Sequence, residues 1–253
     1  MKGRKGGRSK KRYCYKMNNN IYRLSNTDIE KWKKKSDIII IPIGSLEQHG
    51  AHLPVSTDSI IIEYLAKNVA EKIQCLYIPA ITYGISYEHE PLFNISISNN
   101  TFSNLIGDVC VSLAKYGMKS IILLNGHHGN LGSMHYVSQN VSLKISSNTR
   151  VDFINYWNLM KEFDHAGEIE TSLLLAINTK LVKMKKACGN TNEIRGSKIA
   201  YTSLTSSPGS FLKITGNGVW GDPTKASVLK GRSLLNDLIL RIEQTIVELR
   251  QYN

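Results

Sequence analysis

The stretch IIIIPIGSLEQHG, residues 38–50, joins a continuous apolar run to a polar loop. A short run that is rich in isoleucine predicts a strand buried on both faces, as in a parallel sheet. The glycine, serine and histidine that follow are typical of a loop. We therefore expect Glu47 and His49 just past the carboxyl end of this strand, where open α/β sheets bind their ligands.

A second stretch, KSIILLNGHHGN (residues 119–130), has the same organisation. Its apolar half predicts another buried strand, which opens directly into turn-forming residues around His127 and His128. If both strands are central and parallel, their carboxyl ends meet at one edge of the sheet. We therefore expect His127 to lie close to Glu47 and His49.

Asp58 adds a carboxylate to this edge, at the expected start of the next helix. It is well placed to cap that helix, and its two oxygens could also bridge two metal ions. Imidazole and carboxylate together suit Zn²⁺, Mn²⁺ or Fe²⁺. A lone loop histidine is more often an ordinary surface residue, but the pattern of Glu47, His49, Asp58 and His127 together indicates a metal site.

Strand and helix patterns alternate along the rest of the chain, which favours one α/β domain with a mainly parallel sheet between helix layers. The expected strands are 38–43, 75–81, 119–124 and 150–157, and the expected helices are 25–35, 58–73, 102–113, 131–144, 167–178 and 225–250. Residues 185–224 lack periodicity and predict a long loop region that completes a site or an interface.

The stretch DHAGEIETS, residues 164–172, supplies three further candidates. His165 precedes the expected helix, and Glu168 and Glu170 lie in its first turn. Acidic residues in that position commonly serve the helix itself, because they interact favourably with its dipole and its free N–H groups. Propensity alone therefore gives these two glutamates a structural role.

The amino terminus carries most of the net charge of +12, since residues 1–16 hold eight Lys or Arg and no acid. We expect residues 1–20 to form a disordered basic tail, or an over-extended start with Met17 as the true first residue. The alternative is an arm that binds nucleic acid or an anionic surface, in which Tyr13 and Tyr15 would stack. Residues 21–253 are expected to form the single domain.

Cysteine usage and hydropathy point to a cytoplasmic protein. Cys75 and Cys110 lie in apolar segments, and no CxxC pair is present, so we expect buried free thiols and no zinc-thiolate site. No apolar run approaches the roughly 18 residues that would span a membrane. No apolar segment of a secretory signal follows the basic start.

The chain resembles the creatininase family of metal-dependent amidohydrolases. The matching motifs are PIGSLEQHGAHLPVSTD (42–58), NGHHGN (125–130), HAGEIETSLLLAI (165–177) and GVWGDPTKAS (218–227), in the family's order. The resemblance implies a three-layer αβα sandwich, a ring-like homo-oligomer for which a hexamer is one candidate, and two divalent metals per subunit, with Zn, Mn and Fe left open.

The resemblance also assigns residues by position. One metal takes Glu47, Asp58 and His127, and the other takes His49 and the same Asp58. His165 matches the family's catalytic histidine, which passes a proton to the departing amine. We expect His128, Trp157 and His89 to contact the substrate or to form the wall of the pocket, and His52 to be structural.

Gly129 departs from the family pattern, because creatininase proper has a glutamate there that binds the second metal. We expect Glu168 to fill this vacancy. Glu170 is the next candidate, and it matches a glutamate that the family carries anyway, which suits a supporting role beside the catalytic residues.

The expected function is hydrolysis of a non-standard amide by a water that two metals activate: a cyclic amide, a formamide, or a short peptide in cofactor maturation. The motifs are closer to the maturation members, and Gly129 argues against creatininase itself. Arg195 and Lys198 are the candidates for a phosphate-bearing substrate. The alternatives are binding through the basic arm, creatininase activity in the strict sense, and a degenerate, inactive relative.

Overall fold

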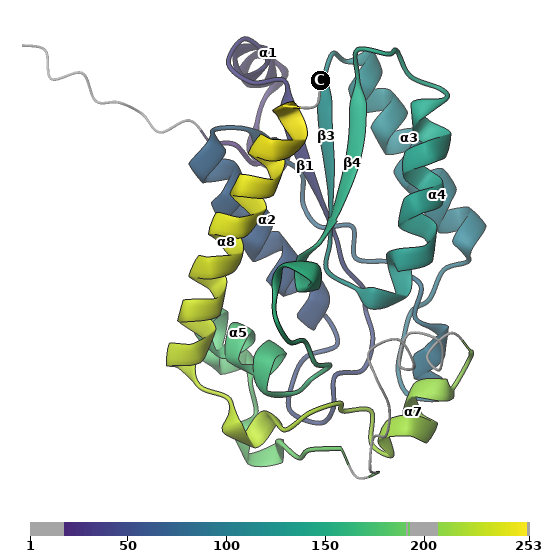
Figure 1. Ribbon diagram of the computed structural model, residues 1–253, viewed down its shortest axis with the longest axis vertical. Helices are drawn as coiled ribbons and strands as arrows, with labels where there is room; N and C mark the ends of the chain where they lie inside the picture. Colours follow the sequence, from purple (N-terminus) through teal and green to yellow (C-terminus); the bar gives the residue numbers. More distant parts are fainter. Residues whose placement is uncertain (1–17, 191, 193–206, 252–253) are drawn as a thin grey trace, which may run out of the picture.

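The computed structural model describes residues 18–190, 192 and 207–251. Strands and helices alternate along the described chain (Figure 1). The strands are β1 (Ile38–Ile43), β2 (Leu76–Tyr77), β3 (Ser120–Asn125) and β4 (Arg150–Asn155). The helices are α1 (Asn26–Lys33), α2 (Thr57–Ile73), α3 (Asn99–Lys115), α4 (Leu131–Ser142), α5 (Glu168–Asn178), α7 (Ser210–Thr215) and α8 (Val228–Gln251).

The four strands form one parallel sheet in the order β2-β1-β3-β4. The register pairs Ile43 with Asn125 and Asn125 with Asn155, so β1, β3 and β4 all end at the same level. The loops that follow these strands therefore leave the sheet side by side. This arrangement confirms the expected sheet and places the loops after residues 43 and 125 at one edge.

Two helix layers cover the two faces of the sheet (Figure 1). Ile40 of β1 and Ile122 of β3 belong to a core shared with α2, α5 and α8. Their neighbours Ile39 and Ile121 point to the other face, into a core shared with α3 and α4. Because successive strand residues point to opposite faces, an unbroken isoleucine run fills both cores. The fold is the expected three-layer αβα sandwich.

The edge at β2 differs from its sequence expectation. Continuous pairing with β1 is confined to Leu76 and Tyr77 of the expected strand 75–81, and Ile81 meets β1 again in a single bridge to Ile43. On its outer side the Tyr77 N–H donates to the Asn19 carbonyl at 3.1 Å, so the last residues of the expected tail lie along the sheet edge. Residues 1–17 of that tail lie outside the described residues. The expected loop region 185–224 also contains a short helix, α7.

The described cysteines agree with the sequence. Cys75 and Cys110 are free and buried, whereas Cys188 is free and exposed. Burial raises the pKa of the Cys110 thiol to about 12, so it is a packing residue and not a nucleophile. None of the helices in the described part of the chain combines the length and apolarity needed to cross a bilayer.

Candidate metal centre

A buried group of acids and histidines lies at the carboxyl edge of the sheet. Glu47 and His49 come from the loop after β1, and His127 follows the last residue of β3. Asp58 lies in the first turn of α2, and Glu170 in the first turn of α5. All five side chains are buried, and Glu47 and His49 are 0% exposed. The structure thus brings together four of the five expected ligands, with Glu170 beside them.

The first donor group consists of Glu47, Asp58 and His127, with donor atoms within 4.8 Å of one another. His127 Nε2 lies 2.7 Å from the Ile85 carbonyl, which can only accept, so this nitrogen carries the hydrogen. That leaves Nδ1, 3.0 Å from Asp58 Oδ2, with its lone pair available. Among the described residues Glu47 Oε2 is buried and has no hydrogen-bond partner, although His127 Nε2 lies 3.3 Å from it. Both atoms suit a cation.

The second donor group consists of His49, Asp58 and Glu170. His49 Nδ1 donates to the Glu47 carbonyl at 3.1 Å, which leaves Nε2 as the available nitrogen. Nε2 lies 3.0 Å from Asp58 Oδ1 and 3.6 Å from Glu170 Oε2. Backbone carbonyls therefore orient both histidines and direct one nitrogen of each toward Asp58.

Asp58 lies between the two groups and is a member of both. One carboxylate oxygen contacts His49 and the other contacts His127. Ser45 Oγ donates to the second oxygen at 2.7 Å and holds the side chain in place. The expectation that Asp58 also caps α2 was wrong, because the helix begins one residue earlier with Ser56 as its N-cap, and the Asp58 carboxylate contacts the two histidines instead. Asp58 is thus the carboxylate that the two donor groups share.

The charge balance of this region fits divalent cations. Within the described part of the chain, neither Lys nor Arg lines the cavity, which is about 30 Å³ in volume. Five carboxylates do line it: Glu47, Asp58, Glu88, Asp164 and Glu170. Burying so many anions without counter-charge is costly. His49 shows the effect of these anions: burial lowers its pKa, but Asp58 and Glu170 outweigh burial and raise that pKa to about 10.

The structure separates the roles expected of Glu168 and Glu170. Glu168 turns away from the other donors and forms an ion pair with Lys230 of α8 at 2.8 Å. Glu170 faces the cavity, and burial raises its pKa to about 8. Successive residues of an α-helix are rotated by about 100° about its axis, so side chains two residues apart point to nearly opposite faces. The expected second-metal ligand Glu168 is thus placed outside the group, and Glu170 inside it.

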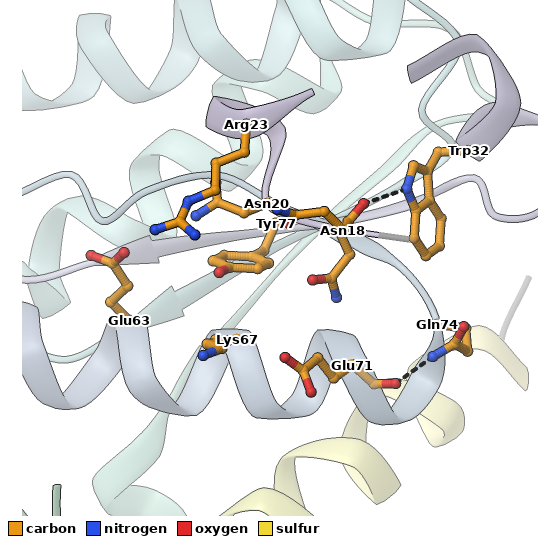
Figure 2. A pocket seen from close by; sticks show the side chains of 10 residues that line it. Asn18, Asn20, Arg23, Trp32, Glu63, Lys67, Glu71, Gln74 and Tyr77 are labelled. Atoms are coloured by element: carbon orange, nitrogen blue, oxygen red, sulfur yellow. Dashed lines mark hydrogen bonds between the residues drawn. The ribbon is translucent and has the colours of Figure 1, made fainter. Parts of the chain in front are cut away.

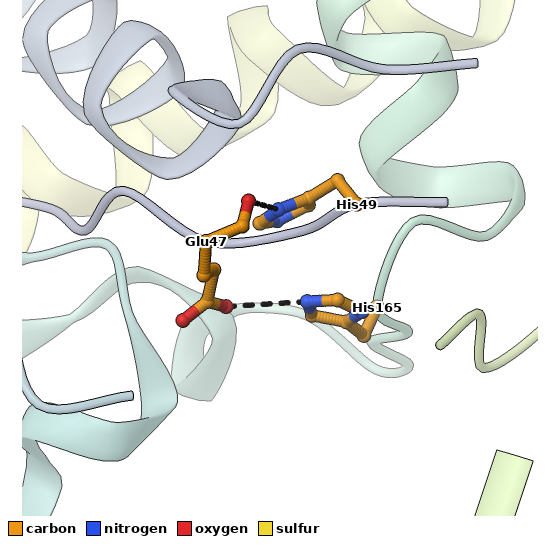
Figure 3. Close-up of side chains that lie close together, drawn as sticks. All are labelled: Glu47, His49 and His165. Atoms are coloured by element: carbon orange, nitrogen blue, oxygen red, sulfur yellow. Dashed lines mark hydrogen bonds and ion pairs between the residues drawn. The ribbon is translucent and has the colours of Figure 1, made fainter. Parts of the chain in front are cut away.

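His165 is held against the metal-binding loop by a distant segment. Its backbone pairs with Trp220 through two hydrogen bonds of 3.1 and 2.8 Å. Its Nε2 lies 3.2 Å from Glu47 Oε1, and its ring lies beside His49, as Figure 3 shows. Burial and the neighbouring His49 lower the pKa of His165 to about 3, so the ring is neutral near pH 7. The expected loop region therefore does complete the site.

The expected wall residues line the same cavity: His89, His128 and Trp157. The His128 ring lies 5.6 Å from Trp157, and burial lowers its pKa to about 4. His52 lies outside this lining and contacts Thr171 Oγ1 at 2.9 Å, in agreement with a structural role. Arg195 and Lys198, named above for a phosphate-bearing substrate, lie outside the described residues.

Glu88 is a member of the site that the sequence did not indicate. Its carboxylate lines the cavity and lies 4.0 Å from His127 Nε2. It lies over Gly129, where a Cβ atom would come within 2.8 Å of Glu88 Oε1 and 2.0 Å of the Ile85 carbonyl. Glycine at 129 thus makes room for the segment that carries Glu88. Its acidity in an otherwise irregular stretch was the only sequence signal.

A larger cavity, of about 470 Å³, lies elsewhere (Figure 2). It opens between the start of the described chain and the part of α2 from Glu63 to Glu71, and Glu71 follows Asp58 by about 20 Å along the helix axis. The described residues that line it mix Arg23 and Lys67 with Glu63 and Glu71, and none of them is a histidine. Its size does not make it the chemical centre.

Comparison with known proteins decides the family. The creatininase family model, described as creatinine amidohydrolase, matches residues 22–246. The chain belongs to this family. A mycofactocin precursor peptide peptidase of Mycobacterium tuberculosis is 29% identical over 223 residues, which cover 82% of this chain and 85% of the relative. A creatinine amidohydrolase of Pseudomonas putida is 27% identical over 179 residues, covering 59% and 67%.

The family also accounts for the fold. A solved structure of creatininase with Mn superimposes with a TM-score of 0.77 and covers 92% of this chain and 98% of its own. The two sequences are 22% identical in that comparison, so it bears on the fold alone. Family membership and the αβα sandwich were both expected from the motifs, and both are confirmed.

Proposed function

We propose that this creatininase-family amidohydrolase cleaves a non-standard amide with two divalent metal ions per chain. Glu47, Asp58 and His127 would hold one ion, and His49, Asp58 and Glu170 the other. The observation that carries the proposal is the position of Asp58, with one oxygen on each histidine. When bound, such a metal pair supplies a nucleophilic water near neutral pH and polarises the amide carbonyl.

His165 is the group that moves the proton. It lines the cavity beside the ligand Glu47, so it is placed to accept a proton released there and to give it to the departing amine. Its Nδ1 is buried and no described residue hydrogen-bonds to it, which leaves that nitrogen available. The backbone pairing with Trp220 holds the main chain of His165 in place beside the site.

The aromatic wall bears on the substrate. His128, Trp157 and Phe163 line one side of the cavity, and the His128 and Phe163 rings are stacked with centroids 6.3 Å apart. A planar amide or an aromatic side chain next to it fits such a surface. Among the family's activities we favour cleavage of a short peptide in cofactor maturation. The longer match to a peptidase than to a creatinine amidohydrolase supports this choice.

The proposal extends to the identity of the metal, the oligomeric state and the cellular compartment. The mixed donor set accepts Zn, Mn or Fe, and availability decides among them. We propose a homo-oligomeric ring, with a hexamer as the first candidate, formed by a single domain of residues 21–253. The buried free thiols suit the reducing cytoplasm.

A substrate panel tests the proposal. Metal-loaded protein is assayed with creatinine, formamidopyrimidine compounds and short peptides, and it should cleave at least one. His165→Asn should lower kcat by about 10²–10⁴-fold, the usual contribution of a general acid–base. The matched control is His135→Asn, since His135 is exposed on α4 and packs on Phe153. Unchanged turnover in His165→Asn, or a panel that stays uncleaved, contradicts the proposal.

A further inference from the structure

The side chain of Gln48 connects three separate segments behind the metal centre. It lies between the proposed ligands Glu47 and His49 in sequence and is 7% exposed. Its Oε1 accepts from the Gly50 N–H at 3.0 Å, and its Nε2 lies 2.9 Å from the Gly218 carbonyl. The same Nε2 lies 2.8 Å from His89 Nδ1. None of the roles assigned above uses this residue.

The two backbone partners fix the orientation of the amide. The Gly50 N–H can only donate, and the Gly218 carbonyl can only accept. Turning the amide over would place two donors together at Gly50 and two acceptors together at Gly218. Nε2 therefore faces Gly218 and uses one hydrogen there. Its second hydrogen is the one directed at His89.

This orientation determines which nitrogen of His89 carries the hydrogen. Nδ1 must accept from Gln48, so a neutral ring carries its hydrogen on Nε2. Nε2 lies 3.1 Å from Glu47 Oε1, and the ring is 2% exposed. His89 Nε2 therefore donates a hydrogen bond to Glu47. Since this nitrogen carries the hydrogen, it has no lone pair with which to bind a metal or a second proton.

We infer that Gln48 is a positioning residue: it holds His89 as the Nε2–H tautomer, which in turn holds Glu47 Oε1 and leaves Oε2 to the metal. In the described part of the chain Glu47 Oε2 makes no hydrogen bond, and His127 Nε2 lies 3.3 Å from it. The metal part of this inference rests on the proposed function, whereas the tautomer does not. It also gives His89 a role other than the substrate contact expected from the sequence.

Gly218 is part of the same hydrogen-bond network around Gln48. It has a φ of +76°, and a Cβ atom there would lie 2.3 Å from Gln48 Oε1. Only glycine lets this backbone come close enough for its carbonyl to receive the amide hydrogen. The segment that pairs with His165 through Trp220 is thus also the segment that orients Gln48. The segment from Gly218 to Trp220 therefore supports both His165 and, through Gln48 and His89, the ligand Glu47.

Determining which nitrogen of His89 carries the hydrogen tests this inference directly. Zinc-loaded protein with isotope-labelled histidine is studied by long-range proton–nitrogen NMR, and His89→Asn assigns the signal. Wild type should show a protonated Nε2 and a bare Nδ1. Gln48→Glu keeps an acceptor for Gly50 but presents an acceptor to Nδ1, so the hydrogen should move to Nδ1. The matched control Gln74→Glu, remote from the centre, should leave the His89 signal unchanged. A hydrogen on Nδ1 in wild type, or an unchanged signal in Gln48→Glu, overturns the inference.

Zinc affinity separates positioning from a purely structural tie. Gln48→Met keeps the length of the side chain but loses the donor, and it should weaken zinc binding about 10–100-fold, as the loss of an outer supporting group does. Unchanged affinity would overturn the positioning role. If wild type shows the expected tautomer but cleaves no amide, the proposed function fails while the assignment of Gln48 and His89 stands.

Discussion

Replacing each of the two glutamates of α5 in turn gives the sharpest prediction from the geometry. Glu170→Gln removes the only carboxylate that the second donor group does not share with the first. His49 and Asp58 would remain, which is too few protein ligands for a tightly held ion. Metal content should fall from two ions per chain to one. Glu168→Gln is the matched variant and should keep both.

The magnitudes follow from the contacts. Losing a direct ligand should weaken binding of the second ion by more than the about 10–100-fold that an outer supporting group contributes. The Ala166 N–H donates to Glu170 Oε2 at 2.6 Å, and the amide oxygen introduced by Glu170→Gln can accept the same hydrogen bond, so the fold should survive. Glu168 loses only a partly exposed ion pair with Lys230, worth about 0–1 kcal/mol.

The stability of the metal-free protein should also depend on pH through Glu170. Burial raises the pKa of Glu170 to about 8, so the folded chain keeps a proton there that the unfolded chain releases near its ordinary value. Stability should therefore fall as pH rises toward 8, and Glu170→Gln should flatten that slope. Elemental analysis and thermal unfolding of both variants are the assays. Two ions retained in Glu170→Gln, or one lost in Glu168→Gln, would refute the reasoning.

Three further predictions concern the rest of the chain. Leu238→Ala leaves a hole in the core beneath α8, where Leu238 is 0% exposed, and should cost about 2–5 kcal/mol in denaturant unfolding; a smaller loss would mean a loosely packed layer. Burial lowers the pKa of His52 to about 4, so the protein should lose stability as pH falls from about 6.5 toward 4. His52→Gln should reduce that loss in thermal melts, and an identical pH profile would contradict the shift. Deleting residues 1–16 should leave kcat/KM unchanged because the proposed site starts at Glu47, and lost turnover would favour a role for the arm.

The sheet and its edge could be predicted because they depend on local pattern. An unbroken run such as 38–43 can only be buried on both faces, and this requires helix layers on either side. The strand ends then place Glu47 and His127 together. The length of β2 was overestimated because the apolar pattern continues past Tyr77, whereas continuous strand pairing ends there and returns only as the bridge of Ile81 to Ile43.

The choice between Glu168 and Glu170 depended on helix phase. Glu170 lies three and four residues before Leu173 and Leu174, which are both fully buried, so it shares the inward face of α5. That spacing in the sequence predicts an inward-facing Glu170. It is stronger evidence than the absence of a glutamate at position 129, which was the reason for choosing Glu168. Glu88 and Gln48 had no comparable signal, because their partners at Gly129 and Gly218 are brought to them only by the folded chain.

The central claim is a pair of metal ions that share Asp58. The measurement that tests it most directly is the metal content of the purified protein, counted by elemental analysis after loading with Zn, Mn or Fe in turn. We predict two ions per chain in wild type and the loss of both in Asp58→Ala. A wild-type ratio of one or none with every metal, or an Asp58→Ala variant that keeps two, would contradict it.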